Sequence, residues 1–197
     1  MEAGRGPIAA AGAPYMRNPS TYVALLRGIN VGGKHLLPMK DLAVVFAQAG
    51  CINVRTYIQS GNVIFSAPAP LLKGLPELIT ERIAARFGYC VPIVIRTSQQ
   101  LARTIRDNPF LQAGASEKML HVCFLADPPN ALAIANLDPH RSPPDAFHVL
   151  NQEIYLHLPN GGARSKLTNA YFDAKLSTTG TVRNWATVLK LFEMMQA

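Results

Sequence analysis

The sequence has few cysteines, a single tryptophan and no long apolar run. The cysteines Cys51, Cys90 and Cys123 are odd in number and form no C-x-x-C pair. This argues against a disulfide framework or a zinc site and favours a reducing compartment, the cytoplasm. No window approaches the about 18 apolar residues that a membrane-spanning helix needs, so no membrane partner is expected.

Other absences exclude classes of chemistry. The histidines lack the spacing of metal ligands, and no pair of carboxylates falls in a polar loop. We therefore expect no metal, no resident cofactor and no carboxylate-driven glycosidase or nuclease reaction. Positive charge is in excess, with a net charge of +7, but no run of five like charges occurs. A scattered excess is typical of a solvated surface, so nucleic-acid binding is an alternative that is not favoured.

The composition, 49% hydrophobic and 16% charged over 197 residues, is that of a compact globular chain. Residues 1–20 differ, because they are rich in glycine, alanine and proline and lack the apolar centre of a signal peptide. They predict a disordered leader. Met16 lies just before the first strand and is an alternative to Met1 as the start of translation.

Hydrophobic periodicity in the first half predicts two helices among four strands. Pro38 opens the first helix and Gly50 closes it, and the second helix spans 72–87. The strands are expected at 22–27, 53–58, 62–65 and 91–96. The order β-α-β-β-α-β is the split βαβ pattern of a ferredoxin-like domain.

The second half resembles the first. After a helix at 98–107, the pattern predicts a strand at 120–126, a helix at 128–136, a hairpin of 146–150 and 153–158, and helices at 167–176 and 181–195. We therefore predict an α+β fold of two consecutive ferredoxin-like subdomains with antiparallel sheets, the second incomplete or modified. Their boundaries are 21–97 and 118–197, joined by a helix and loop at 98–117.

This topology predicts two polar clusters. In a sheet of order 4-1-3-2, the end of strand 1 meets the turn between strands 2 and 3, so the loop at 28–34 neighbours the turn at 59–62. In the second half, the loop at 159–166 returns to the edge near Lys118 and His121.

The loop from Gly28 to Lys34 matches the spacing of a nucleotide-binding P-loop up to its last position, where His35 replaces Ser or Thr. The strand at 122–127 ends in Asp, as the partner motif of such loops does. However, the helix begins only after Pro38 and the expected sheet is antiparallel, so a P-loop is not favoured. Glycines that serve only tight turns, with a solvated Lys34, are a further alternative. The turn at 59–62 is likewise either an ordinary hairpin connection or a set of neutral donors beside an anion.

Two later segments add polar candidates. In the second glycine-rich loop, Ser165 is a candidate helix cap, and Arg164 and Lys166 flank the positive helix end. Thr181 is expected to cap the last helix, whose Trp185 is expected in the core. Arg183 and Asn184 would then lie off the apolar face, where an anionic partner could offset an arginine placed in the first turn.

Several motifs resemble one uncharacterised, mainly bacterial family, domain of unknown function 1697. They are Leu25-Leu-Arg-Gly-Ile-Asn-Val-Gly-Gly-Lys34 with Pro38-Met39, Arg55-Thr-Tyr-Ile-Gln-Ser-Gly-Asn62, Asn108-Pro-Phe110, Leu158-Pro-Asn-Gly161, Ser165-Lys-Leu167 and Thr181-Val-Arg-Asn-Trp185. The resemblance covers about residues 21–195. It implies a two-part α+β fold with a ferredoxin-like first half and a variable position at His35. It implies no established activity.

These observations favour a cytoplasmic protein that binds a phosphate-bearing small molecule between or beside its halves. A nucleic-acid-binding module and a non-catalytic partner-binding protein are the alternatives, and no reaction is indicated. Basic residues would supply charge, and amides, hydroxyls and glycines would orient the ligand. The candidate residues are Arg27, Asn30, Gly32, Gly33, Lys34, Ser60, Gly61, Asn62, Asn160, Arg164, Ser165, Lys166, Arg183 and Asn184.

Overall fold

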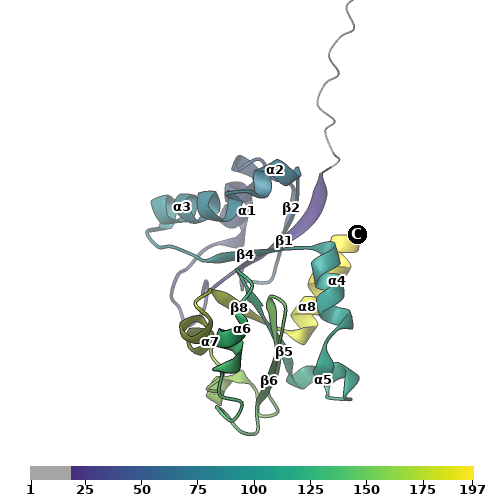
Figure 1. Cartoon of the computed structure of the whole chain (residues 1–197). Helices are drawn as coiled ribbons and strands as arrows, with labels where there is room; N and C mark the ends of the chain where they lie inside the picture. The colour runs from purple at the N-terminus through teal and green to yellow at the C-terminus, as the bar shows by residue number, and fades with distance from the viewer. Residues whose placement is uncertain (1–18) are drawn as a thin grey trace, which may run out of the picture.

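The computed structural model describes residues 19–197. The predicted leader and the alternative start at Met16 lie outside the described residues, apart from Pro19 and Ser20. The first half contains β1 (Ser20–Leu26), α1 (Met39–Gln48), β2 (Ile52–Tyr57), β3 (Asn62–Ala67), α2 (Ala69–Leu72), α3 (Leu75–Phe87), β4 (Ile93–Thr97) and α4 (Ser98–Arg106). The second half follows a short helix, α5 (Pro109–Gln112), and contains β5 (Leu120–Leu125), α6 (Ala131–Ala135), β6 (Ala146–Leu150), β7 (Glu153–His157), α7 (Asn169–Leu176), β8 (Gly180–Asn184) and α8 (Trp185–Gln196), as Figure 1 shows.

The fold is α+β with two four-stranded antiparallel sheets, which confirms the predicted class at that level. The strand orders are β2-β3-β1-β4 and β6-β7-β5-β8, so the second sheet repeats the first strand for strand. The helices repeat as well, because α4 follows β4 just as α8 follows β8.

Two element predictions are wrong. Gly180–Asn184 is the strand β8, where a helix was expected from Thr181, so the second half does not lack its fourth strand. Asn184, rather than Thr181, caps α8 by accepting from the Thr187 amide at 2.8 Å. Both residues are good helix caps, so the local sequence does not distinguish them. The predicted helix at 72–87 is divided into α2 and α3 around Gly74, whose φ of +85° interrupts helical geometry.

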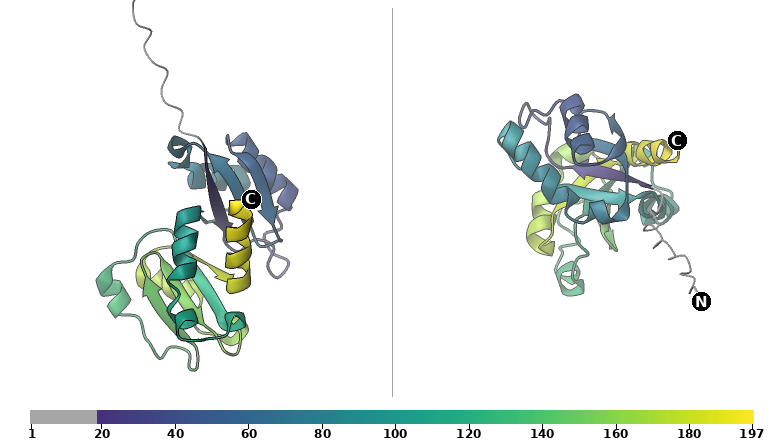
Figure 2. Two further views of the ribbon diagram at one scale, coloured as in Figure 1. Left: turned by 90° about the vertical axis from the view of Figure 1, so that its right-hand side faces the viewer. Right: turned by 90° about the horizontal axis from the view of Figure 1, so that it is seen from above.

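Three apolar clusters hold the elements together. Figure 2 shows how the helices and sheets that they join are arranged. Helices α1 and α3 cover the outer face of the first sheet, where Phe46 packs against Phe65. Helix α7 covers the outer face of the second sheet through Phe172. The inner faces of both sheets share a central core with α4 and α8, and this core includes Trp185. The core position predicted for Trp185 is confirmed.

No helix within residues 19–197 has the length and apolar character needed to cross a membrane.

Candidate ligand site at the glycine hairpin

Residues 28–37 join β1 to α1 and fold back on themselves as a tight hairpin. The Lys34 amide donates to the Val31 carbonyl at 3.1 Å, and the Asn30 amide donates to the His35 carbonyl at 3.1 Å. Gly32 and Gly33 form the two-residue turn with φ of +58° and +72°, as a hairpin of this length requires. The loop therefore lacks P-loop geometry, since two of its amides close the hairpin instead of facing a ligand.

Asn30 fixes the hairpin to its surroundings. Its side-chain amide donates to the carbonyls of Leu37 at 2.9 Å and Gln59 at 2.8 Å, and its Oδ1 accepts from the Leu37 amide at 2.8 Å. The predicted proximity of the glycine loop to the turn at 59–62 is confirmed by these contacts. Asn30 is thereby occupied within the protein, and it orders the loop instead of offering its amide to a ligand.

Arg183 is buried, with 7% of its surface exposed, and all three guanidinium nitrogens donate hydrogen bonds. The acceptors are Asn62 Oδ1 (2.6 Å), Thr181 Oγ1 (2.8 Å) and the carbonyls of Val182 (2.9 Å), Leu26 (2.7 Å), Ser60 (3.1 Å) and Gly61 (3.2 Å). None of these partners is a carboxylate, and burial lowers the pKa of Arg183 to about 10. The expectation that Arg183 lies in the first turn of the last helix, off its apolar face, is wrong, because it lies in β8. It ties β8 to the first half instead.

The turn residues Ser60, Gly61 and Asn62 face this guanidinium. Asn62 is fully buried, and its amide nitrogen donates to Ser60 Oγ at 3.0 Å and to the Tyr57 carbonyl at 3.2 Å. At Gly61 a Cβ would lie 2.7 Å from Leu26 Cβ, so only glycine fits there. These three residues are occupied by contacts within the protein and leave few groups for a ligand.

The exposed part of the hairpin carries a lysine and a planar surface. The His35 ring stacks on Tyr89 with 4.6 Å between centroids, and the Tyr89 hydroxyl donates to the Leu36 carbonyl at 3.0 Å. Lys34 takes part in none of the ion pairs found among residues 19–197. Arg27 does, because it pairs with Asp173 of α7. Sequence reasoning missed Tyr89, because no local pattern links it to a loop more than 50 residues earlier.

The second predicted loop is a separate surface. Asn160, Arg164 and Lys166 are exposed. The predicted Ser165 cap is wrong, because α7 begins at Asn169 with Thr168 as its cap. The Ser165 hydroxyl instead accepts from the Leu167 amide at 3.1 Å.

The Leu158 amide donates to the Met119 carbonyl at 2.8 Å, so this loop does start beside the expected edge of the second sheet. Within residues 19–197, no hydrogen bond or ion pair joins the loop to the glycine hairpin. The two predicted clusters therefore do not form one bonded site.

The sequence model of a family described as Protein of unknown function (DUF1697) matches residues 20–155. The chain belongs to this family. The DUF1697 chain is also similar to a solved structure, that of the conserved bacterial protein SP0830 from Streptococcus pneumoniae. The TM-score is 0.68 at 18% sequence identity, over 91% of this chain and 99% of that chain. At that identity the similarity shows a shared fold alone. No curated protein matches the chain.

Proposed function

We propose that this DUF1697 protein binds a phosphate-bearing ligand on the glycine hairpin, with Lys34 on the phosphate and the His35–Tyr89 stack against a flat ring. One observation carries the proposal: the hairpin exists in only one of two equivalent halves. The connection from β1 to α1 spans 27–38, whereas the equivalent connection from β5 to α6 spans only 126–130. The fold itself does not need the longer loop, and long ordered loops commonly carry binding residues.

Order in the hairpin supports binding. Two contacts hold the loop in one conformation: the three hydrogen bonds of the Asn30 side chain, and the contact of the His35 ring nitrogen with the Gly28 carbonyl at 3.2 Å. A loop that is already ordered loses less conformational entropy when a ligand binds. Asn30, Asn62 and Arg183 are therefore assigned to shaping the site rather than to contacting the ligand.

The chemistry of the exposed groups favours a nucleotide-like ligand. Lys34 has no carboxylate partner within 4 Å among the described residues, so its charge is available to a phosphate. The Gly32–Gly33 turn is open on its outer side, since a Cβ at either position would meet nothing within 4 Å. A stacked pair of rings provides the flat apolar surface on which a base can lie.

Two alternatives use the same surface. A single-stranded nucleic acid would also combine phosphates with stacked bases. A protein partner would use the exposed apolar side chains of Val31 (64% exposed) and Leu36 (67% exposed), which flank Lys34. A nucleic-acid site would bind longer oligonucleotides more tightly and lose affinity steeply as the salt concentration rises, which distinguishes it from a site for a single nucleotide.

Calorimetric titration with adenosine 5′-monophosphate, ribose 5-phosphate, adenosine and an oligonucleotide of about ten nucleotides tests the proposal. We expect the monophosphate to bind more tightly than either fragment. Lys34→Gln should weaken it about tenfold through loss of a charge-assisted hydrogen bond. Lys118→Gln, an exposed lysine in the other half, is the matched control and should leave affinity unchanged. Binding of none of the phosphate-bearing probes at about 1 mM would contradict the proposal.

The finer fold description is also our proposal. We propose that both halves are ferredoxin-like subdomains of a cytoplasmic protein, with boundaries near 21–97 and 118–197. The strand order β4-β1-β3-β2 in the first half supports this description, as does its repeat in the second. Because α4 and α8 follow equivalent strands, we extend the first half from residue 97 to residue 106, so that it includes α4, and leave 107–117 as the connector.

A further inference from the structure

The first sheet ends at β4, and part of this strand's backbone faces outward. The Arg27 amide donates to the Pro92 carbonyl at 3.0 Å, which fixes the alternation of the antiparallel ladder. By that alternation, Ile93, Ile95 and Thr97 direct their amides and carbonyls away from β1. Two contacts agree with this assignment. The Thr97 amide donates to Gln100 Oε1 at 2.8 Å, and the Ile95 carbonyl accepts from Arg96 Nη1 at 3.0 Å, neither of which belongs to the ladder.

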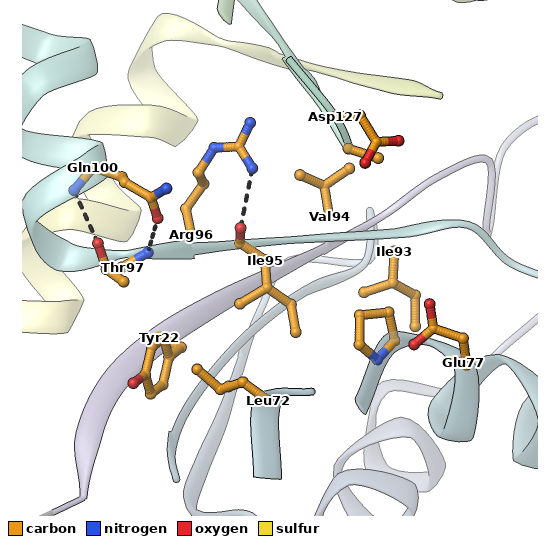
Figure 3. Close-up of a pocket in the computed structure, with 12 residues that line it drawn as sticks. Tyr22, Leu72, Glu77, Ile93, Val94, Ile95, Arg96, Thr97, Gln100 and Asp127 are labelled. Carbon is orange, nitrogen blue, oxygen red and sulfur yellow. Dashed lines mark hydrogen bonds between the residues drawn. The ribbon is translucent and has the colours of Figure 1, made fainter. Parts of the chain in front are cut away.

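A groove lies along this edge. Two adjoining cavities of about 420 Å³ and 400 Å³ share the lining residues Pro76, Glu77, Ile93 and Ala126. Figure 3 shows side chains from both faces of β4 around the first cavity, with Glu77 on one side of the strand and Asp127 on the other. The cavity therefore opens on the strand edge, between α3 and the end of β5. None of its lining residues belongs to the glycine hairpin.

At the equivalent edge in the second half, the matching amide already has a partner. Gly180 of β8 is opposite Leu125, as Ile93 of β4 is opposite Leu26. The outward amide of Gly180 donates to Asp173 Oδ1 at 2.9 Å, and Asp173 in turn pairs with Arg27. The protein thus supplies an acceptor to one edge from its own α7. At the other edge, the matching amide of Ile93 faces a groove.

We infer that the β4 groove binds an extended peptide carrying a basic side chain, which adds to the first sheet as a fifth strand. The Thr97 amide and the Ile95 carbonyl already have partners within the protein, so a peptide would pair with the amide and carbonyl of Ile93 and with the Ile95 amide. Groups spaced along a strand favour a peptide backbone over a compact small molecule.

Three carboxylates line the groove, those of Glu77, Glu81 and Asp127. The cation in the same lining, Arg96, is already paired with Glu153 at 2.9 Å, so the groove favours a basic side chain.

Seven-residue peptides of alternating valine and threonine, with both termini capped, test this inference. One has a central lysine, one has a central glutamate, and two copies of the lysine peptide are N-methylated on alternate backbone amides. In amide NMR titrations, the lysine peptide should shift the signals of Ile93 and Ile95 and bind about tenfold more tightly than the glutamate peptide. One of the two N-methylated peptides should fail to bind, because only one set of amides faces the protein.

Substitutions in the groove and on other surfaces test whether the peptide binds in the groove. Ala126→Trp fills the groove from an exposed position and should abolish binding, and Glu77→Gln with Asp127→Asn should weaken it severalfold. Glu193→Gln, at an exposed carboxylate on α8, and Lys34→Gln in the hairpin should both leave binding unchanged. If Ala126→Trp does not fold, the Glu77 and Asp127 variants decide the matter. The inference is overturned if no peptide binds at about 1 mM. Equal binding by the lysine and glutamate peptides, or by both N-methylated copies, would overturn it as well.

Discussion

Arg96 and Arg183 occupy the fourth position of equivalent strands, and each donates hydrogen bonds to the opposite half of the protein. Arg96 donates to the Leu125 carbonyl (2.7 Å), the Gln152 carbonyl (3.2 Å) and Glu153 Oε1 (2.9 Å). Arg183 donates to the Leu26 carbonyl (2.7 Å), the Gly61 carbonyl (3.2 Å) and Asn62 Oδ1 (2.6 Å). The acceptors correspond one to one: the last residue of a central strand, the hairpin turn, and the first residue of the next strand.

The correspondence stops at the third acceptor, which is a carboxylate for Arg96 and an amide for Arg183. Arg96 therefore has an ionic partner, whereas Arg183 is a buried cation held by dipoles alone. Each guanidinium also donates to the carbonyl of its preceding residue, Ile95 or Val182. The two halves are thus joined by reciprocal contacts, in which one arginine from each half donates hydrogen bonds to the other half.

Arg183→Met should lower the free energy of unfolding by about 3 kcal/mol, because it leaves several buried acceptors without a donor. Urea denaturation measures the effect. Arg103→Met, at an exposed arginine on α4, is the control and should change stability by no more than about 0.5 kcal/mol. A loss below about 1 kcal/mol in Arg183→Met would mean that solvent or other donors satisfy these acceptors.

Gly61→Ala should destabilise the protein by about 2 kcal/mol more than Gly33→Ala. Both glycines have positive φ, so alanine costs about 1 kcal/mol at each position through the backbone alone. At Gly61 the added Cβ would lie 2.7 Å from Leu26 Cβ, whereas at Gly33 it would meet no other atom within 4 Å. Thermal unfolding of the two variants isolates the steric part. Equal losses would show that the turn shifts to accommodate the methyl group.

Stability should fall as the pH drops below about 6.5, in part because of His121. Desolvation lowers the pKa of His121 in the folded protein, so the unfolded chain binds a proton first as the pH falls. The contribution of His121 is therefore fully present above the unfolded pKa and is lost as the pH decreases toward the folded pKa. His121→Gln should flatten this part of the stability curve. His148→Gln, at an exposed histidine, should not, and an unchanged slope in His121→Gln would refute the assignment.

Thiol alkylation should distinguish the three cysteines. Burial raises the pKa of Cys51 to about 11 and that of Cys123 to about 12, while Cys90 is exposed. Because the thiolate is the reactive form, iodoacetamide at pH 8 should label Cys90 alone in the native protein and all three cysteines in denaturant. Mass spectrometry counts the adducts. Rapid native labelling of Cys123 would show that the packing between β5 and α7 opens readily.

Much of the fold could be predicted because its elements carry clear local patterns. The hairpin of β6 and β7 and the end of α3 at Gly88 follow from periodicity and turn residues. The neighbouring position of the glycine loop and the turn at 59–62 follows from strand order alone. What could not be predicted depends on distant contacts. The five residues of β8 show no strong alternation, and their inward arginine is explained only by carbonyls up to 157 residues away.

The candidate site, too, could be predicted where local sequence marks it and not where distant contacts decide it. Glycines and Lys34 mark the loop in the sequence, but whether a polar residue contacts a ligand or holds the scaffold is decided by its partners. Asn30, Asn62 and Arg183 suit an anion site by residue type, yet the structure uses all three internally. Conversely, Tyr89 has no distinctive sequence context and becomes part of the surface only through its contact with His35.

The contact between Arg183 and Leu26 also sets an order of events during synthesis. Leu26 and Asn62, which supply two of the acceptors, are translated long before Arg183, which lies 157 residues beyond Leu26 in the sequence. The first half therefore leaves the ribosome with an apolar sheet face uncovered and with polar groups that only the last strand satisfies. We therefore expect a nascent chain that stalls before β8 to expose the kind of apolar surface that chaperones and proteases recognise, and translation of β8 and α8 to complete both halves together.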